Sequence, residues 1–248
     1  MNLNIQRTLF ERHAVDNPQL PAVSVDPLVR PGFSLFHGDC LRLMLDIEPG
    51  SVDACITDPP YGIDYQSSHR YSVDKLKKIA NDAKPYIWWL PHAYRAMKAD
   101  SCLVCFTRWD VQEIFRAAIE CAGFTVKSQV IWDRRIHGMG DLEGSFAPQH
   151  DVVWFAHKGN FKFPGKRPKS VLRCQRLQGE ELTHPNEKPL GIMGELILAT
   201  TKPGGVVLDP FMGSGVSGAA CAKLGREYIG IELDDVYFDN ARRRILAA

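Results

Sequence analysis

The first residues that could carry chemistry form the stretch CITDPPYGI, residues 55–63. Asp58 and Tyr61 flank Pro59 and Pro60, directly after an apolar run that is typical of a buried strand. Proline fixes φ and has no backbone N–H, so neither a strand nor a helix continues through this pair. The stretch predicts a rigid elbow with a carboxylate and an aromatic ring at its tip, although Asp-Pro also forms plain turns.

A second candidate site is the glycine-rich run DPFMGSGVSG at residues 209–218. It has the spacing Gly213-x-Gly215-x-x-Gly218, follows a strand-like run and opens a helix-like one, and Glu232 ends the next predicted strand. This context is typical of loops that let the backbone approach an adenosine-containing ligand while an acid binds the ribose hydroxyls. The spacing leaves both NAD and S-adenosylmethionine open as that ligand.

Asp209 favours S-adenosylmethionine over NAD. A carboxylate at the tip of the strand would repel a pyrophosphate, whereas it would attract the ammonium and sulfonium groups of S-adenosylmethionine. The alternative interpretation is that Asp209 only caps the next turn. We therefore expect S-adenosylmethionine as the cofactor.

The elements that must position these residues alternate between apolar strands and helices, which predicts an α/β fold with a doubly wound, mostly parallel sheet. We expect an irregular N-terminal arm at residues 1–32 and one domain at residues 33–248. Asp110 is expected to cap a helix that Gly123 ends. Strands are predicted at 33–39, 53–58, 102–107, 125–132, 151–158, 206–209 and 226–232, and helices within 85–100, 110–123, 189–205, 217–225 and from 234 onwards.

Composition excludes several classes of protein. The 248 residues carry a net charge of +1, and no run of about eighteen apolar residues exists, so no membrane span and no secretory signal are expected. Seven scattered cysteines indicate a reducing compartment and a cytoplasmic location. Cys102 and Cys105 lie in a strand-like run without a second ligand pair, so we expect no metal site.

A basic segment at residues 158–182 is the candidate nucleic-acid surface, because it has no acid between residues 158 and 179. A solvated loop is the alternative interpretation. Its basic residues are Lys158, Lys162, Lys166, Arg167, Lys169, Arg173 and Arg176.

Five separated motifs together resemble one family, the amino-methylating DNA methyltransferases of the β group, which have a permuted motif order. The motifs are HGDC (37–40), TDPPYG (57–62), THPNEKPL (183–190), DPFMGSG (209–215) and YIGIELDDVYFDNARRRI (228–245), so the resemblance spans residues 33–248. It implies a Rossmann-like methyltransferase fold, and we expect the basic residues 158–182 to form a small target-recognition insertion in it. One departure is that Val216, followed by Ser217, stands where the family commonly has threonine.

The resemblance implies a role for the elbow. The Asp58 carboxylate and the Pro59 carbonyl would accept hydrogen bonds from the target amino group, with Pro60 completing the elbow and Tyr61 stacking on a flipped base. An exocyclic amine is a poor nucleophile, because its lone pair is delocalised into the ring. Two acceptors localise that lone pair, and they stabilise the positive charge that develops on nitrogen.

The resemblance also implies the cofactor contacts. Glu232 would bind the ribose hydroxyls, Asp39 the adenine amino group with the Cys40 backbone beside it, and Lys188 the methionine carboxylate, with Asp58 nearby. The alternative interpretation of Lys188 is an exposed lysine at the start of a helix. The loop around the methionine moiety would consist of Asp209, Pro210, Phe211, Gly213, Ser214 and Gly215.

The expected substrate is adenine in double-stranded DNA, methylated at N6, because DPPY is commoner among adenine enzymes. Cytosine N4 remains the alternative, whereas carbon-5 methylation needs a Pro-Cys dipeptide that the chain lacks. We expect the 62–84 loop, with Arg70, to close over the base, and the chain to form a homodimer. The other classes considered are an NAD-dependent oxidoreductase, a catalytically silent DNA-binding protein and an RNA methyltransferase.

Overall fold

A computed structural model describes residues 24–62, 84–138, 142–177 and 187–248. Nine strands form one sheet in the order β1-β2-β9-β8-β3-β4-β6-β5-β7. All neighbours are parallel except at the β1–β2, β4–β6 and β5–β6 pairs, so the predicted α/β fold is confirmed. The strands are β1 (Ser24–Arg30), β2 (Phe33–His37), β3 (Val52–Thr57), β4 (Met97–Thr107), β5 (Thr125–Asp133), β6 (His150–Lys158), β7 (Val171–Arg173), β8 (Val206–Asp209) and β9 (Glu227–Glu232).

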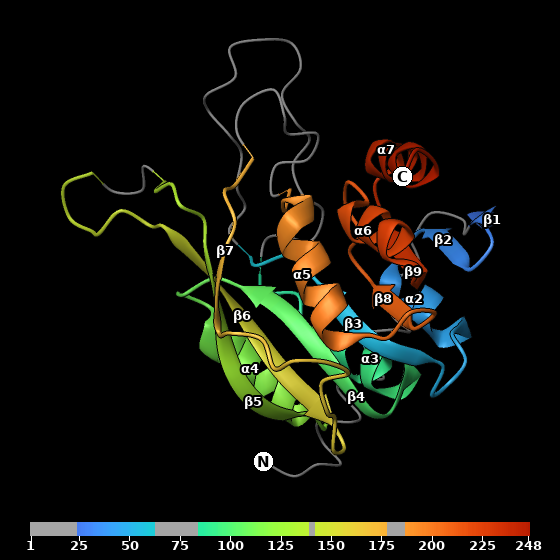
Figure 1. The fold of residues 1–248 in the computed structure, drawn as a ribbon, viewed down its shortest axis with the longest axis horizontal. Coiled ribbons are helices and arrows are strands. Elements are labelled where there is room, and N and C mark those ends of the chain that lie inside the picture. The colour runs from blue at the N-terminus through green and yellow to red at the C-terminus, as the bar shows by residue number, and fades with distance from the viewer. Residues whose placement is uncertain (1–23, 63–83, 139–141, 178–186) are drawn as a thin grey trace.

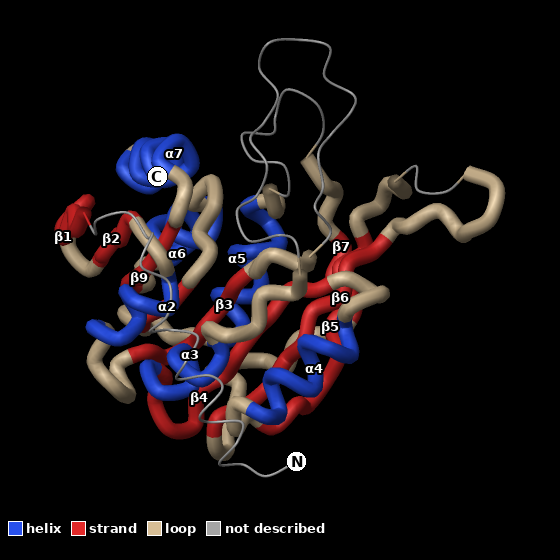
Figure 2. The backbone as a smooth tube through the Cα atoms, turned by 180° about the vertical axis from the view of Figure 1, so that it is seen from behind, coloured by secondary structure: helices blue, strands red, loops and turns tan. Residues whose placement is uncertain are grey.

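Helices cover both faces of this sheet. Figure 1 shows α5 and α6 in front of the strands with α7 beside them, and Figure 2 shows α2, α3 and α4 on the other face. The central strands are therefore buried on both sides, which explains their continuous apolar sequences. The helices are α2 (Cys40–Leu43), the short 3-10 helix η1 (Met44–Asp46), α3 (Leu90–Ala96), α4 (Gln112–Cys121), α5 (Leu190–Thr200), α6 (Val216–Leu224) and α7 (Asp235–Leu246).

Helix ends follow local chemistry at most positions. The Asp234 carboxylate caps α7 by accepting from the backbone N–H groups of Val236 and Tyr237, at 2.8 and 3.1 Å. Gly123, with a φ of +105°, follows α4 as predicted. Asp110 was expected to cap α4, and this is wrong: Val111 takes that position, and the Asp110 carboxylate binds the Arg108 guanidinium instead, at 2.6 and 3.1 Å.

Three other predicted boundaries need correction. Residues 24–30 of the expected irregular arm form β1, because they pair antiparallel with β2 along the sheet edge. The helix expected within 85–100 is confined to α3, and β4 already begins at Met97. Within the expected insertion, β7 pairs with β5, so residues 171–173 belong to the main sheet. None of the helices in the described ranges combines the length and the apolar character that a membrane span requires.

Gly215 precedes α6 where the chain passes against α7. Its φ is +76°, and an added Cβ would lie 2.7 Å from the Cα of Ala241. Gly225 ends the same helix with a similar φ of +66°, but an added Cβ there would meet nothing within 4 Å. The two glycines therefore share one backbone conformation but differ in the space around an added Cβ atom.

We predict that Gly225→Ala lowers the free energy of unfolding by about 1–2 kcal/mol, the cost of a left-handed conformation. Gly215→Ala should cost about 2–4 kcal/mol, because backbone crowding adds to the same conformational term. Urea denaturation of the ligand-free protein measures both values. Equal losses in the two variants would contradict the close packing between α6 and α7.

Candidate active site

The candidate site lies where four adjacent parallel strands end. Strands β2, β9, β8 and β3 are neighbours, and β3 comes early in the chain whereas β8 and β9 come late. Ligands of open α/β sheets bind at such carboxyl ends, where the order of the strands changes direction. A cavity there is lined by residues that include Gly38, Asp39, Cys40, Asp58, Pro59, Pro60, Tyr86, Glu187, Lys188, Asp209, Pro210, Phe211, Met212, Gly213, Ser214, Ser217, Glu232 and Tyr237.

The cavity thus brings together twelve of the fourteen predicted catalytic and cofactor residues. Gly215 is not among the lining residues, because it closes the turn behind the loop and donates its N–H to the Met212 carbonyl at 2.8 Å. Tyr61 is also outside the lining. Its ring is 6% exposed and packs edge-on against Phe115, with 6.3 Å between the centroids. In this structure, therefore, Tyr61 presents no open face for a base.

Asp58 follows β3 and carries two hydrogen bonds. The Tyr61 hydroxyl donates to one carboxylate oxygen, and the Lys188 ammonium donates to the other. Burial raises the pKa of Asp58, while the charge of Lys188 and the two hydrogen bonds oppose that rise. Lys188 was predicted to bind the methionine carboxylate, but its ammonium pairs with Asp58 here.

Asp209 ends β8 and braces the glycine loop. Its buried carboxylate accepts from the Thr57 hydroxyl at 2.7 Å, from the Ser217 hydroxyl at 2.5 Å and from the Phe211 N–H at 3.2 Å. Burial, opposed by these hydrogen bonds, raises the pKa of Asp209 to about 6. Ser217 also hydrogen-bonds the Tyr228 hydroxyl at 2.7 Å, so the hydroxyl group one position after Val216 serves the framework of the loop.

Glu232 ends β9 and joins two loops. One carboxylate oxygen accepts from the Gly213 N–H at 2.9 Å, and the other accepts from the N–H groups of Leu233 and Asp234, each at 2.9 Å. Burial raises the pKa of Glu232 to about 7, although these hydrogen bonds favour the charged form. An ionised carboxylate has about four acceptor positions, so one remains for a ligand hydroxyl.

Asp39, which follows β2, both caps a helix and lines the cavity. Its carboxylate caps α2 by accepting from the N–H groups of Leu41 and Arg42, at 2.8 and 3.4 Å, and it lines the cavity beside Cys40. The cavity therefore has six carboxylates on its wall, those of Asp39, Asp58, Glu187, Asp209, Glu232 and Asp234. A ligand with cationic groups and hydroxyls fits this lining, whereas a pyrophosphate does not.

Comparison with known proteins identifies the family. A family described as DNA methylase, which comprises the N6 and N4 enzymes, matches residues 52–243. The chain belongs to this family of DNA methyltransferases. S-adenosylmethionine is therefore the cofactor, and it fits the acidic cavity at the strand ends.

Individual relatives cover most of this methyltransferase. The Escherichia coli (strain K12) protein YubD is 32% identical over 214 residues, which are 85% of this chain and 89% of YubD. The type II methyltransferase M2.MboI of Moraxella bovis is 26% identical over 238 residues, 86% of this chain and 87% of that protein. The crystal structure of the M1.HpyAVI–SAM complex is 26% identical with a TM-score of 0.68, covering 86% of this chain and 98% of that one.

The sequence did not predict the aromatic wall of the methyltransferase site. Tyr86 and Trp89 contact the Phe211 ring edge-on, with centroid distances of 5.9 and 5.5 Å. The Tyr86 N–H donates to the Pro60 carbonyl at 3.1 Å, which fastens the elbow to this wall. The aromatic run PYIWW was visible in the sequence, but its helical spacing placed it in the helix predicted within residues 85–100.

Glu187 and Arg244 were also missed as site residues, although both lie within the motifs at residues 183–190 and 228–245. The Arg244 guanidinium binds the Glu187 carboxylate at 2.7 Å and the Ser214 hydroxyl at 3.0 Å. This contact links the C-terminal helix α7 to the glycine loop and to the segment that carries Lys188. The three segments are far apart in the sequence, so only the fold brings them together.

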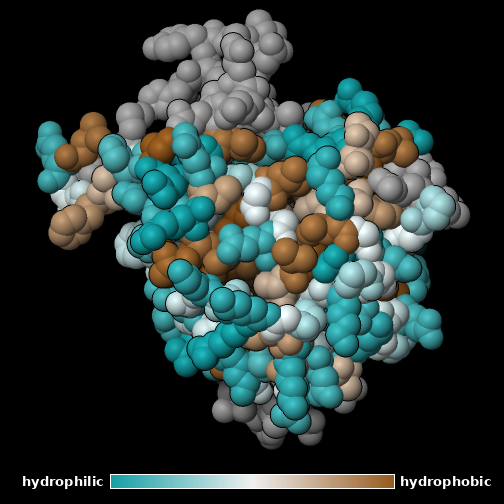
Figure 3. Space-filling model, in the orientation of Figure 1, coloured by the Kyte–Doolittle hydropathy of each residue, from teal (hydrophilic) through white to brown (hydrophobic). Residues whose placement is uncertain are grey.

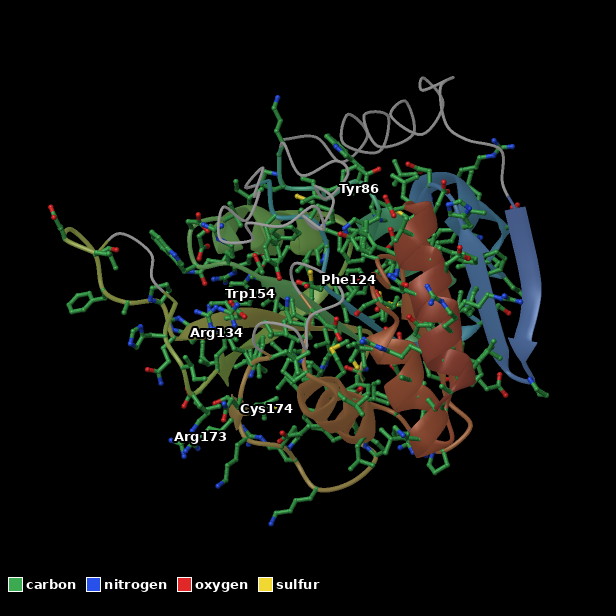
Figure 4. The ribbon with its side chains drawn as sticks, turned by 90° about the horizontal axis from the view of Figure 1, so that it is seen from above. Tyr86, Phe124, Arg134, Trp154, Arg173 and Cys174 are labelled. Atoms are coloured by element: carbon green, nitrogen blue, oxygen red, sulfur yellow. The ribbon has the colours of Figure 1, made fainter. Side chains whose placement is uncertain are left out.

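The predicted DNA-binding residues are spread over the molecule. The Lys158 ammonium donates to the carbonyls of Tyr94 and Met97, at 2.6 and 2.5 Å, at the opposite end of the sheet from the cavity. Arg173 is exposed near the carboxyl edge, and Figure 4, seen from above, shows it on the same side as Arg134. Arg70 lies outside the described residues.

The middle of the basic segment crosses the α5 face of the sheet. Arg167 and Lys169 line a second cavity there, between α5 and strands β5 to β7, with Phe155 and Phe163 on its apolar wall. Figure 3 shows apolar side chains around a hollow at the centre of this face. Lys162 and Lys166 are exposed in the same segment.

We predict a pH-dependent stability that depends on Glu232. Its pKa is higher in the folded state than its ordinary value of 4.5, so the folded state binds its proton more strongly. The resulting stabilisation is complete below about pH 4.5 and is lost as the pH rises through 7. This group alone should lower the free energy of unfolding by up to about 3 kcal/mol between pH 5 and 8.

Urea denaturation at several pH values measures this effect in the wild type, in Glu232→Gln and in Glu227→Gln. Glu227 lies at the exposed start of the same strand and serves as the control. Glu232→Gln should flatten the pH dependence, and Glu227→Gln should keep it. An unchanged slope in Glu232→Gln would show that Glu232 is not the titrating group.

Proposed function

We propose that this methyltransferase transfers a methyl group from S-adenosylmethionine to the N6 amino group of a flipped adenine in duplex DNA. One observation carries the proposal: Asp58 and Pro59 line the same cavity as Asp209 and Glu232. The acceptors for an amino group are thus next to the acidic residues that suit the cofactor. An NAD-dependent oxidoreductase would leave the elbow without a purpose.

In the proposed mechanism, bound S-adenosylmethionine supplies an electrophilic methyl group on a sulfonium. The Asp58 carboxylate and the Pro59 carbonyl accept hydrogen bonds from the target amino group and localise its lone pair. Pro60 holds the elbow rigid, and its carbonyl binds the Tyr86 N–H. After methyl transfer the amino nitrogen carries an extra proton, and Asp58 is the nearest carboxylate to receive it.

The remaining proposed cofactor contacts follow the position of each side chain around the cavity. Glu232 would accept from the ribose hydroxyls through its unused acceptor position, and Asp39 from the adenine amino group. The main-chain groups of Gly213 and Ser214 would surround the methionine moiety beside Phe211. The aromatic wall gives this part of the cavity its apolar surface.

We predict that incubation with unmethylated DNA and methyl-labelled S-adenosylmethionine places the label in 6-methyladenine. Asp58→Ala should reduce the rate by at least 100-fold, because it removes one acceptor of the amino group. Enzymatic digestion and mass spectrometry of the nucleosides identify the product, and cofactor binding by Asp58→Ala is the control for folding. Label in 4-methylcytosine would contradict the choice of base, and label in RNA alone would contradict the choice of polymer.

We propose that the duplex lies across the carboxyl edge of the sheet. The target base must enter there, and Arg173 and Arg176 lie at this edge, with the Arg176 N–H bonded to the Arg134 carbonyl at 3.3 Å. Lys162 lies nearer the opposite end, two residues after Asn160, whose N–H binds Asp100 at 2.7 Å. A homodimer, which would span a longer site, remains a prediction that sedimentation can test.

We predict that Arg176→Glu weakens DNA binding about tenfold at 0.1 M salt and reduces the salt dependence. Lys162→Glu makes the same change of charge. It should change the affinity by less than about twofold when Lys162 is farther from the duplex than the Debye length of about 10 Å. Fluorescence anisotropy at several salt concentrations measures both, and cofactor affinity should remain the same. A larger loss in Lys162→Glu would place the duplex over the α5 face instead.

A further inference from the structure

The Lys188 ammonium occupies the acceptor that the target amine needs. Tyr61 donates to one oxygen of Asp58 and Lys188 to the other. Lys188 lines the cavity and Tyr61 does not, and we infer from this that an amine in the cavity would meet the oxygen bound by Lys188. An ammonium and an amino group offer the same kind of N–H donor to that oxygen.

The surroundings of Lys188 show that its position is built into the fold. The residue is 8% exposed, although lysine is rarely buried without a partner. Its ammonium lies 5.1 Å from the centre of the Phe106 ring and 5.9 Å from that of Tyr61. Both rings stabilise a cation at this place, and the Asp58 carboxylate neutralises it.

We propose that Lys188 is a placeholder for the target amine. In the enzyme without DNA, its ammonium keeps Asp58 ionised and oriented, and the arriving amino group displaces it. This inference rests on the proposed function. During transfer the N–C bond forms as the C–S bond breaks, with its electron pair going to sulfur. The nitrogen then gives a proton to Asp58, which passes it to water, and Lys188 returns.

The groups around Asp58 determine how its protonation responds to the removal of Lys188. Asp151, near the start of β6, adds negative charge near Asp58, and so does Asp209 at the tip of β8. Lys188 therefore supplies the favourable charge that opposes burial. Without it, Asp58 should take up a proton at a higher pH. Among the residues that the structure describes, the titratable and charged groups that face Asp58 are Lys188, Tyr61, Asp151, Asp209 and the Cys105 thiol.

Two pH profiles, each measured on the wild type, Lys188→Met and Lys188→Arg, test whether the target amine displaces Lys188. One is kcat/KM for DNA, which reports the enzyme before DNA binds, and the other is the single-turnover rate at saturating DNA. In Lys188→Met the acid limb of kcat/KM should move to higher pH, while that of the single-turnover rate stays at the wild-type position. Lys188→Arg keeps the charge, so both of its limbs should match the wild type.

The other results would overturn the proposal. If both limbs move together in Lys188→Met, Lys188 stays on Asp58 during turnover. If neither limb moves and cofactor affinity falls, Lys188 binds the methionine carboxylate instead. Carbon-13 NMR of labelled aspartate, assigned with Asp58→Asn, follows Asp58 in the protein without DNA and needs no turnover. A wild type that methylates no DNA would contradict the proposed function, whereas an Asp58 titration unaffected by Lys188→Met would contradict the placeholder alone.

Discussion

The hydrogen bond between the Thr57 hydroxyl and the Asp209 carboxylate joins two strand ends that lie 152 residues apart in the sequence. It places the DPPY elbow next to the glycine loop, because β3 and β8 are neighbours in the sheet. The same carboxylate binds Ser217 and the Phe211 N–H, so one buried group fixes the start of both loops. Because of this contact, the acceptors for an amine and the acidic residues that suit the cofactor line the same cavity.

The burial of carboxylates costs free energy, and hydrogen bonds to these groups offset part of that cost in the methyltransferase. Asp209 and Glu232 have three donors each, yet burial still raises their pKa values to about 6 and 7. Asp58 has the Lys188 ammonium in addition. A cationic ligand would offset the remaining cost. The negative charge is thus arranged before the cofactor arrives, and it favours a sulfonium over neutral or anionic ligands.

The aromatic residues give the elbow its rigidity. Tyr86 binds the Pro60 carbonyl and packs edge-on against Phe211, and Trp89 also packs edge-on against Phe211. Tyr61 is packed on Phe115 and bonded to Asp58, so stacking on a flipped base requires that this ring change its position. The structure therefore describes a closed arrangement in which both oxygens of Asp58 already have donors.

The sequence by itself determined the fold class and most of the site. Continuous apolar strands can be buried only in a sheet covered on both faces, and Gly213, Gly215 and the paired prolines have backbone constraints that are visible in a short stretch. Only the tertiary structure decided which distant side chains meet. The ion pair of Lys188 with Asp58, the Arg244 link and the internal role of Lys158 depend on contacts between segments that no local pattern connects.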